Sequence, residues 1–195
     1  MFCLNWMLLS FTVTLLKYSY NDPRPFWLNS EILPLSCSAN YGNPSGHTTQ
    51  AFGNTFFLWL VYRERVTSLW SKLGFALGVW TLALLEAYAR VISGVHSWDQ
   101  VLFSAMLGIW VATFSYFLFK AYLHHHLLRV GKAAVKSKFV FRCIFLSVFG
   151  IVILAGTQLF VFSYKETVML GFPQEWLQNI MAHCPGFDLN EEYQH

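Results

Sequence analysis

The sequence predicts an all-α protein, a polytopic transmembrane bundle of about five helices. The 195-residue chain is 55% hydrophobic and only 12% charged, whereas soluble domains carry about 25% charged residues. Its apolar residues form long continuous runs, and a helix needs roughly 20 residues to cross a bilayer. Helices satisfy their own backbone hydrogen bonds in lipid, so runs of this length favour helices over strands.

Five apolar segments account for most of the chain, and residues 1–165 are predicted to form one membrane-embedded domain. The opening run has neither a basic start nor a cleavage site, so we interpret it as a spanning segment rather than a signal peptide. Residues 166–195 are predicted to form a C-terminal tail that is partly disordered or interfacial. Within it, residues 172–183 are mildly amphipathic and suit either a membrane surface or a mobile end. The apolar segments are 2–16, 48–62, 69–88, 98–122 and 139–163.

Lysine and arginine residues predict how the bundle is oriented. If the helices alternate in direction, nine of the thirteen lie in the loops 63–72 and 120–142, on one face. Loops rich in these residues stay in the cytoplasm. The opposite face, luminal or extracellular, then holds Lys17, Arg24, Arg90 and Lys165.

The composition excludes several classes of function. There is no basic stripe interleaved with aromatic residues, so no nucleic acid partner is expected. The four cysteines have no zinc-ligand spacing, and we predict neither a metal nor another cofactor. The run 124–126 of three histidines is interpreted as a solvated or headgroup-contacting loop. Cys37 and Cys184 share the predicted non-cytoplasmic side, so a disulfide is open to them, but we expect two free thiols because sequence fixes no distance.

The first motif, Lys17 to Pro25, follows the first apolar run. Pro23 and Pro25 stop helix propagation and favour an extended turn. Lys17 and Arg24 would then converge on one anion, with Arg24 providing bidentate geometry for phosphate. The alternative is a pair of basic side chains that reach toward the lipid headgroups.

The second motif is Pro44-Ser45-Gly46-His47, directly before an apolar run. Ser45 is a natural N-cap, and Gly46 lets the backbone approach a ligand. Free N–H groups at a helix N-terminus attract anions. His47, on that first turn, could deliver a proton; otherwise it is an interfacial histidine beside an ordinary cap.

The third motif is Arg90-Val-Ile-Ser-Gly-Val-His96. Glu86 precedes Arg90 by four residues, the favourable order for a helical ion pair. Ser97 and Gln100 have the S-x-x-Q form of a capping box, which predicts a helix start there. His96 therefore lies at another helix N-terminus, unless it is simply a solvated interfacial residue.

Together the motifs indicate a site for a phosphate monoester. Lys17, Arg24 and Arg90 supply three cations, and His47 and His96 supply two imidazoles, all on one predicted face. A phosphate dianion needs charge neutralisation, oriented donors and in-line groups for attack and departure.

These residues resemble the type 2 phosphatidic acid phosphatase and haloperoxidase superfamily, over roughly residues 1–120. The resemblance implies an α-helical fold and metal-independent phosphate ester hydrolysis through a phosphohistidine. It implies His96 as the nucleophile and His47 as the acid for the leaving group. It assigns phosphate binding to Lys17, Arg24, Ser45, Gly46 and Arg90.

Two positions depart from the family pattern. Ala89 stands where the family usually has Ser, which implies one phosphate hydrogen bond fewer. Gln100 stands where the family usually has the Asp that orients the nucleophilic His. The Gln100 amide oxygen can still accept an imidazole N–H. The neighbouring Asp99 points about 100° away on an ideal helix, and it is kept as a second candidate for that role.

We therefore expect an integral membrane phosphatase of the endoplasmic reticulum or another endomembrane, with a luminal or extracellular site. Its expected substrates are lipid phosphate monoesters such as phosphatidate, lysophosphatidate or sphingoid-base phosphates, and its expected partners are this lipid and the bilayer. Gln100 and the run 24–27, Arg-Pro-Phe-Trp, are similar to glucose-6-phosphatase-like members, so a sugar phosphate is the alternative. A non-catalytic lipid-phosphate-binding member is the third reading, motivated by Ala89 and Gln100.

Overall fold

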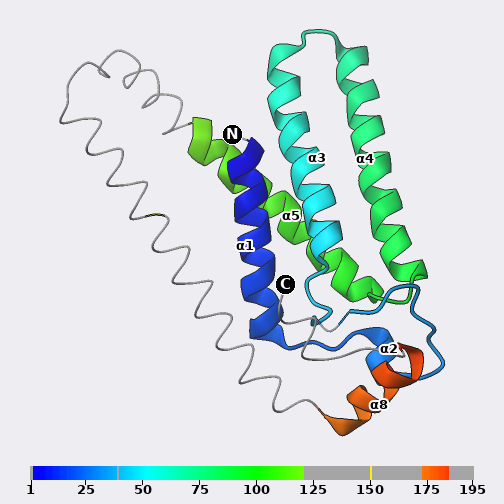
Figure 1. Ribbon diagram of the computed structural model, residues 1–195. Helices are drawn as coiled ribbons and strands as arrows, with labels where there is room; N and C mark the ends of the chain where they lie inside the picture. Colours follow the sequence, from blue (N-terminus) through cyan, green and yellow to red (C-terminus); the bar gives the residue numbers. More distant parts are fainter. Residues whose placement is uncertain (1, 39, 121–149, 151–172, 185–195) are drawn as a thin grey trace.

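The computed structural model describes residues 2–38, 40–120, 150 and 173–184, and within these ranges the protein is helical and has no strand (Figure 1). The all-α prediction is confirmed. The predicted segment 139–163 lies outside the described residues except for Gly150, as does the histidine run 124–126. The helices are α1 (Phe2–Tyr20), α2 (Pro25–Leu28), α3 (Gly46–Arg65), α4 (Leu69–Ile92), α5 (Trp98–Leu118) and α8 (Gln174–His183).

Helix α3 is the centre of the bundle and packs against α1, α4 and α5 (Figure 1). Its contact with α5 depends on two glycines. A Cβ on Gly108 would lie 2.5 Å from the Thr49 carbonyl oxygen, and one on Gly53 would lie 3.1 Å from the Gly108 carbonyl oxygen. Small residues at such crossings let helix backbones approach closely in a membrane protein.

Serines cap the starts of three helices, and two of these caps, Ser45 and Ser97, were predicted from the sequence. Ser45, Ser68 and Ser97 are the N-caps of α3, α4 and α5. Helix α1 ends at Tyr20, shortly before Pro23. Because the helices alternate in direction, the end of α1, the start of α3, the end of α4 and the start of α5 lie at one end of the bundle, with α2 and α8 (Figure 1). All three motifs therefore meet at that end.

The outer surface suits a bilayer. Among the described helices, α4 and α5 are long and apolar enough to cross a membrane. Much of α4 carries exposed leucines, and a contiguous apolar face of this kind marks contact with lipid or another apolar partner. These leucines are Leu69, Leu73, Leu77, Leu82, Leu84 and Leu85.

The tail contributes a helix that packs on the motif end. Ile180 of α8 is buried in one core cluster with Trp27 of α2, and Asn179 Nδ2 donates to the Trp27 carbonyl oxygen at 2.8 Å. Cys37 and Cys184 form a disulfide with a Cα–Cα distance of 6.0 Å. The expectation of two free thiols was wrong, because packing of α8 on α2 brings together cysteines 147 residues apart in sequence.

Candidate active site

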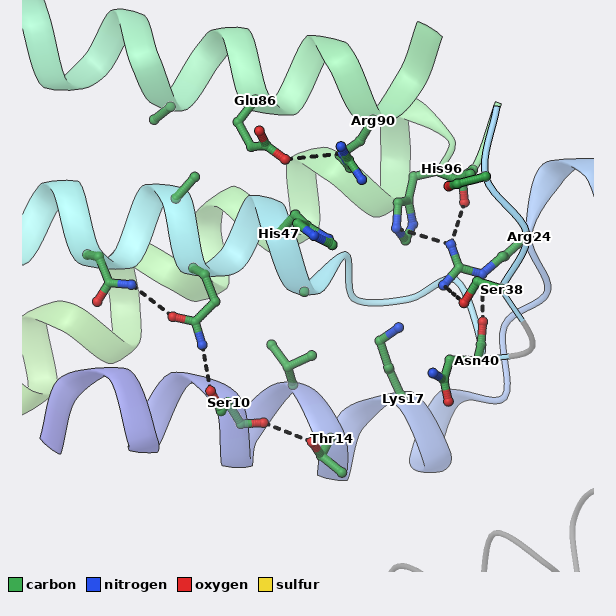
Figure 2. Close-up of a pocket in the computed structure, with 18 of the residues that line it drawn as sticks. Ser10, Thr14, Lys17, Arg24, Ser38, Asn40, His47, Glu86, Arg90 and His96 are labelled. Carbon is green, nitrogen blue, oxygen red and sulfur yellow. Dashed lines mark hydrogen bonds and ion pairs between the residues drawn. The ribbon is translucent and has the colours of Figure 1, made fainter. Parts of the chain in front are cut away.

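A cavity of about 1070 Å³ lies at the motif end of the bundle and continues along α1, α3 and α4. Lys17, Arg24, His47, Arg90 and His96 all line it, and Figure 2 shows their side chains pointing toward one common space. They come from the end of α1, the segment before α2, the first turn of α3, the last turn of α4 and the loop before α5. The structure thus brings together three cations and two imidazoles from all three motifs.

Arg24 is buried, and Ser38 and Asn40 hold its guanidinium. Arg24 Nε donates to the Asn40 carbonyl oxygen at 2.6 Å, and Nη2 donates to Ser38 Oγ at 3.0 Å (Figure 2). Nη1 donates to the Val95 carbonyl oxygen at 3.0 Å and lies 3.3 Å from His96 Nε2. These acceptors fix the plane of the guanidinium directly beside the candidate nucleophile.

His96 is buried, and its two neighbours define its tautomer. Arg24 Nη1 can only donate, so Nε2 must accept. Gln100 Oε1 can only accept and lies 3.3 Å from Nδ1, so Nδ1 must carry the hydrogen. Burial, then the charges of Arg24 and Lys17, lower the pKa of His96 to about 3. The imidazole is therefore neutral at physiological pH, and Nε2, which accepts from Arg24, carries the lone pair that a nucleophile requires.

Gln100 occupies the position expected to orient His96. It is buried, and its Oε1 accepts from His96 Nδ1 and, at 3.4 Å, from the Ser97 backbone N–H. This second contact is one half of the predicted capping box. Asp99 is exposed and is not brought to the imidazole, because the next position on the helix points elsewhere. Ala89 is also exposed on α4 and does not line the cavity.

The start of α3 presents His47 to the cavity through a buried cap. Ser45 Oγ accepts from the Thr48 N–H at 3.5 Å, and the Ser45 N–H donates to Ser104 Oγ at 2.6 Å. Ser45 therefore anchors the turn, whereas Gly46 and His47 line the cavity.

The other two cations also have fixed positions. Lys17 Nζ donates to the Tyr41 carbonyl oxygen at 2.8 Å. Arg90 Nε pairs with Glu86 Oε1 at 3.1 Å, which confirms the predicted ion pair (Figure 2). Glu86 lines the same cavity, so it can hold Arg90 close to a bound phosphate.

A set of polar side chains that line the cavity beyond His47 was not predicted from the sequence. This polar wall consists of Ser10, Thr14, Gln50 and Asn54. Gln50 Nε2 donates to Ser10 Oγ at 2.7 Å, and Asn54 Nδ2 donates to Gln50 Oε1 at 2.8 Å. Asn5 Nδ2 donates to Asn54 Oδ1 at 3.0 Å. A detectable signal existed: Ser10 and Thr14, like Gln50 and Asn54, are polar pairs four residues apart within apolar helices. Polar residues in such segments usually face the bundle interior and mark functional sites.

Among the described residues, no three His, Cys, Asp or Glu side chains are grouped so as to hold a metal ion.

Three cations and two imidazoles around one cavity, in a helical bundle with two helices long and apolar enough to cross a membrane, fit a membrane-associated enzyme of the phosphatase type. The chain belongs to the PAP2 superfamily, whose family model matches residues 1–124. No significant match was found among curated proteins or among solved structures.

Proposed function

We propose that this protein hydrolyses lipid phosphate monoesters through a phosphohistidine formed on His96. One observation carries the proposal: His96, His47 and the three cations Lys17, Arg24 and Arg90 line a single cavity. Such a set can neutralise the equatorial phosphate oxygens while one imidazole attacks and the other serves the leaving group.

In the first step, the Nε2 lone pair of His96 attacks phosphorus, and the ester P–O bond breaks in line. His47 gives its proton to the departing alkoxide, which leaves as an alcohol. The phosphoryl group is now bonded to His96 Nε2, while Nδ1 keeps its hydrogen. Lys17, Arg24 and Arg90 stabilise the charge on the phosphoryl oxygens throughout.

In the second step, His47, now neutral, takes a proton from water as that water attacks phosphorus. The N–P bond breaks, inorganic phosphate forms, and the electron pair returns to His96 Nε2. His47 thus gives a proton in one step and takes one in the next, which a single imidazole can do as general acid and then general base.

The cavity supports a lipid substrate. Its lining includes Trp6, Val13, Leu82 and Ala83 on α1 and α4, and the neighbouring surface of α4 exposes many leucines. An acyl chain in this part of the cavity would be in apolar surroundings while its phosphate lay among the cations.

A sugar phosphate is the second candidate, and the polar wall supports it. Ser10, Thr14, Gln50 and Asn54 line the cavity beyond His47, where their donors and acceptors could bind hydroxyl groups of a polar leaving group. The same groups could also bind the amino or hydroxyl groups of a lysolipid.

The decisive test measures phosphate release with EDTA present, from short-chain phosphatidate, lysophosphatidate, a sphingoid-base phosphate and glucose 6-phosphate. We expect turnover of the lipids, inhibition by vanadate, and no turnover with His96→Ala. Preferred hydrolysis of glucose 6-phosphate would select the second candidate. Labelled phosphate trapped on wild type but not on His96→Ala would exclude a non-catalytic binding protein, whereas wild-type turnover by His96→Ala would reject the nucleophile assignment.

We place the site on the luminal or extracellular face. The Cys37–Cys184 disulfide lies at the motif end, and disulfides persist in oxidising compartments. Arg63, Arg65 and Lys72 lie at the opposite end, around the α3–α4 connection. In sealed microsomes, a glycosylation acceptor added to the segment 29–36 should be modified, and one added between α3 and α4 should not.

A further inference from the structure

The Gln100 amide has four partners, and two of them determine which way round it lies. Its Nε2 donates to Asp22 Oδ2 at 3.0 Å and to the Pro23 carbonyl oxygen at 2.9 Å. Both partners accept only, so a flipped amide would place oxygen against oxygen at both contacts. The contacts with Asp22 and Pro23 therefore orient the amide so that Oε1 faces His96.

Gly42 closes the space around the same amide. A Cβ at this position would lie 2.6 Å from Gln100 Nε2, 2.7 Å from Oε1 and 2.9 Å from Cδ. The Gly42 N–H donates to the Asp22 backbone oxygen at 2.7 Å, which keeps the two segments together. The amide thus has one position as well as one orientation.

Asp22 also supplies the negative charge that position 100 lacks. When His96 Nε2 bonds to phosphorus and Nδ1 retains its hydrogen, the ring becomes cationic. The Nδ1–H then donates more strongly to Gln100 Oε1, and a carboxylate hydrogen-bonded to the far side of the amide increases the negative charge on that oxygen. Charge-assisted hydrogen bonds are about twice as strong as neutral ones, and linked bonds polarise one another.

We propose that Asp22 is a positioning residue for His96: it acts through Gln100 to fix the Nδ1–H tautomer and to stabilise the phosphorylated imidazole. The inference rests on the proposed function of His96 as nucleophile. Asp22 does not line the cavity, so its effect should appear in turnover rather than in substrate binding.

The first test is Asp22→Asn, which keeps the shape and an acceptor but removes the charge. Losing a charge-assisted contact of this kind should lower kcat about tenfold while KM stays within about twofold. Glu31→Gln is the matched control, because Glu31 is exposed in the segment after α2. A purely structural role would instead change KM and thermal stability together. Unchanged kcat in Asp22→Asn would overturn the proposal.

The second test exchanges the Gln100 amide and the Asp22 carboxylate. In Gln100→Glu, the introduced carboxylate faces the Asp22 carboxylate and the Pro23 carbonyl, so kcat should fall further than in Asp22→Asn. In the double variant D22N/Q100E the introduced carboxylate accepts from His96 and from the new amide. We expect its kcat to exceed that of Gln100→Glu by about tenfold, a coupling expected only of groups in contact. Independent, additive losses would contradict the proposal.

The third test is Gly42→Ala. Its methyl would displace the Gln100 amide from its partners, so kcat should fall, and the broken hydrogen bonds should also lower stability by about 1–3 kcal/mol. Gly74→Ala is the control, since a Cβ at Gly74 meets nothing within 4 Å. Full turnover in Gly42→Ala would contradict the requirement for a fixed amide.

A measurement that does not need turnover separates this inference from the proposed function. In histidine ¹⁵N-labelled protein, the His96 signals should report Nδ1–H in the wild type and a mixture of tautomers in Asp22→Asn. If the tautomer changes in this way but the wild type has no phosphatase activity, the positioning role stands and the proposed function is rejected. If the wild type is an active phosphatase but the His96 signals are identical in both proteins, the proposed function stands and the positioning role is rejected.

Discussion

Arg24 Nη1 lies 3.3 Å from His96 Nε2, so the candidate phosphate-binding guanidinium and the candidate nucleophile are in direct contact. The contact joins two motifs 72 residues apart. Arg24 can donate only, so this contact requires that His96 Nε2 carry no hydrogen. It also places the positive charge of the guanidinium beside the position that a phosphoryl oxygen would occupy when His96 attacks.

Arg24→Lys should therefore impair both binding and turnover. A single ammonium group has no planar fork and will not reach the Asn40, Val95 and Ser38 acceptors together. We expect kcat/KM to fall by about 100-fold, with a raised KM and a lowered kcat. The readout is EDTA-insensitive phosphate release, with the exposed Arg65→Lys as the control. Unchanged kinetics would remove Arg24 from the phosphate site.

Acidification should destabilise the protein through His96. Its pKa is about 3 in the folded protein and 6.5 ordinarily, so below pH 6.5 the unfolded state takes up a proton that the folded state does not. The lost stability should amount to about 2 kcal/mol between pH 6.5 and pH 5. Thermal unfolding in detergent at several pH values measures this, and His96→Asn should flatten the profile. An equally steep profile in His96→Asn would contradict the buried neutral imidazole.

Removing the Cys37–Cys184 disulfide should loosen the segment that holds the Arg24 guanidinium. Cys37 is next to Ser38, whose hydroxyl accepts from Arg24, so Cys37→Ser should raise KM as well as lower stability. Loss of such a link costs about 2–5 kcal/mol. Cys184→Ser and the double variant should match Cys37→Ser, because one bond is lost in each. Cys3→Ser, which removes an exposed free thiol, is the control and should change neither KM nor stability. Additive losses in the double variant would argue against a disulfide between Cys37 and Cys184.

The polar wall should show coupling between Asn5 and Asn54. Asn54→Leu leaves Asn5 Nδ2 without the acceptor it has in the wild type, at a cost of about 1–3 kcal/mol. Adding Asn5→Leu removes that unpaired donor, so the double variant should be more stable than the sum of the single variants predicts. A double-mutant cycle by chemical denaturation should give about 0.6–2 kcal/mol of coupling. Strict additivity would mean that the hydrogen bond contributes nothing.

The helices were predictable because their signals are local. Apolar runs placed α3, α4 and α5 close to their observed limits, and the predicted caps at Ser45 and Ser97 marked the starts of α3 and α5. The predicted segment 69–88 extends to Ile92 in the structure, since nothing in residues 89–92 stops a helix. Lys17 likewise lies within α1, because the helix continues to Tyr20 and ends where Asn21 adopts a left-handed φ of 50°.

The candidate site was predictable only in part. Residues that carry charge or nucleophilic chemistry stood out in the motifs, and the three expected cations and two expected histidines line one cavity. Ser45, which was expected to bind phosphate, caps α3 instead and does not line the cavity. Asn40 and Tyr41 gave no signal, because they hold Arg24 and Lys17 through backbone carbonyls, which any residue carries. The Asp22–Gln100 contact spans 78 residues, and no spacing rule could reveal it. The Cys37–Cys184 link was missed for the same reason.

That link has a consequence for biogenesis. The family match ends at residue 124. Cys184, the disulfide partner of Cys37, lies 60 residues beyond that end. While the ribosome is still synthesising the chain, the motifs are present but Cys184 is not. The disulfide that holds the segment beside Arg24 can therefore form only after α8 has been synthesised, so completion of this part of the site depends on a helix that lies beyond the family match.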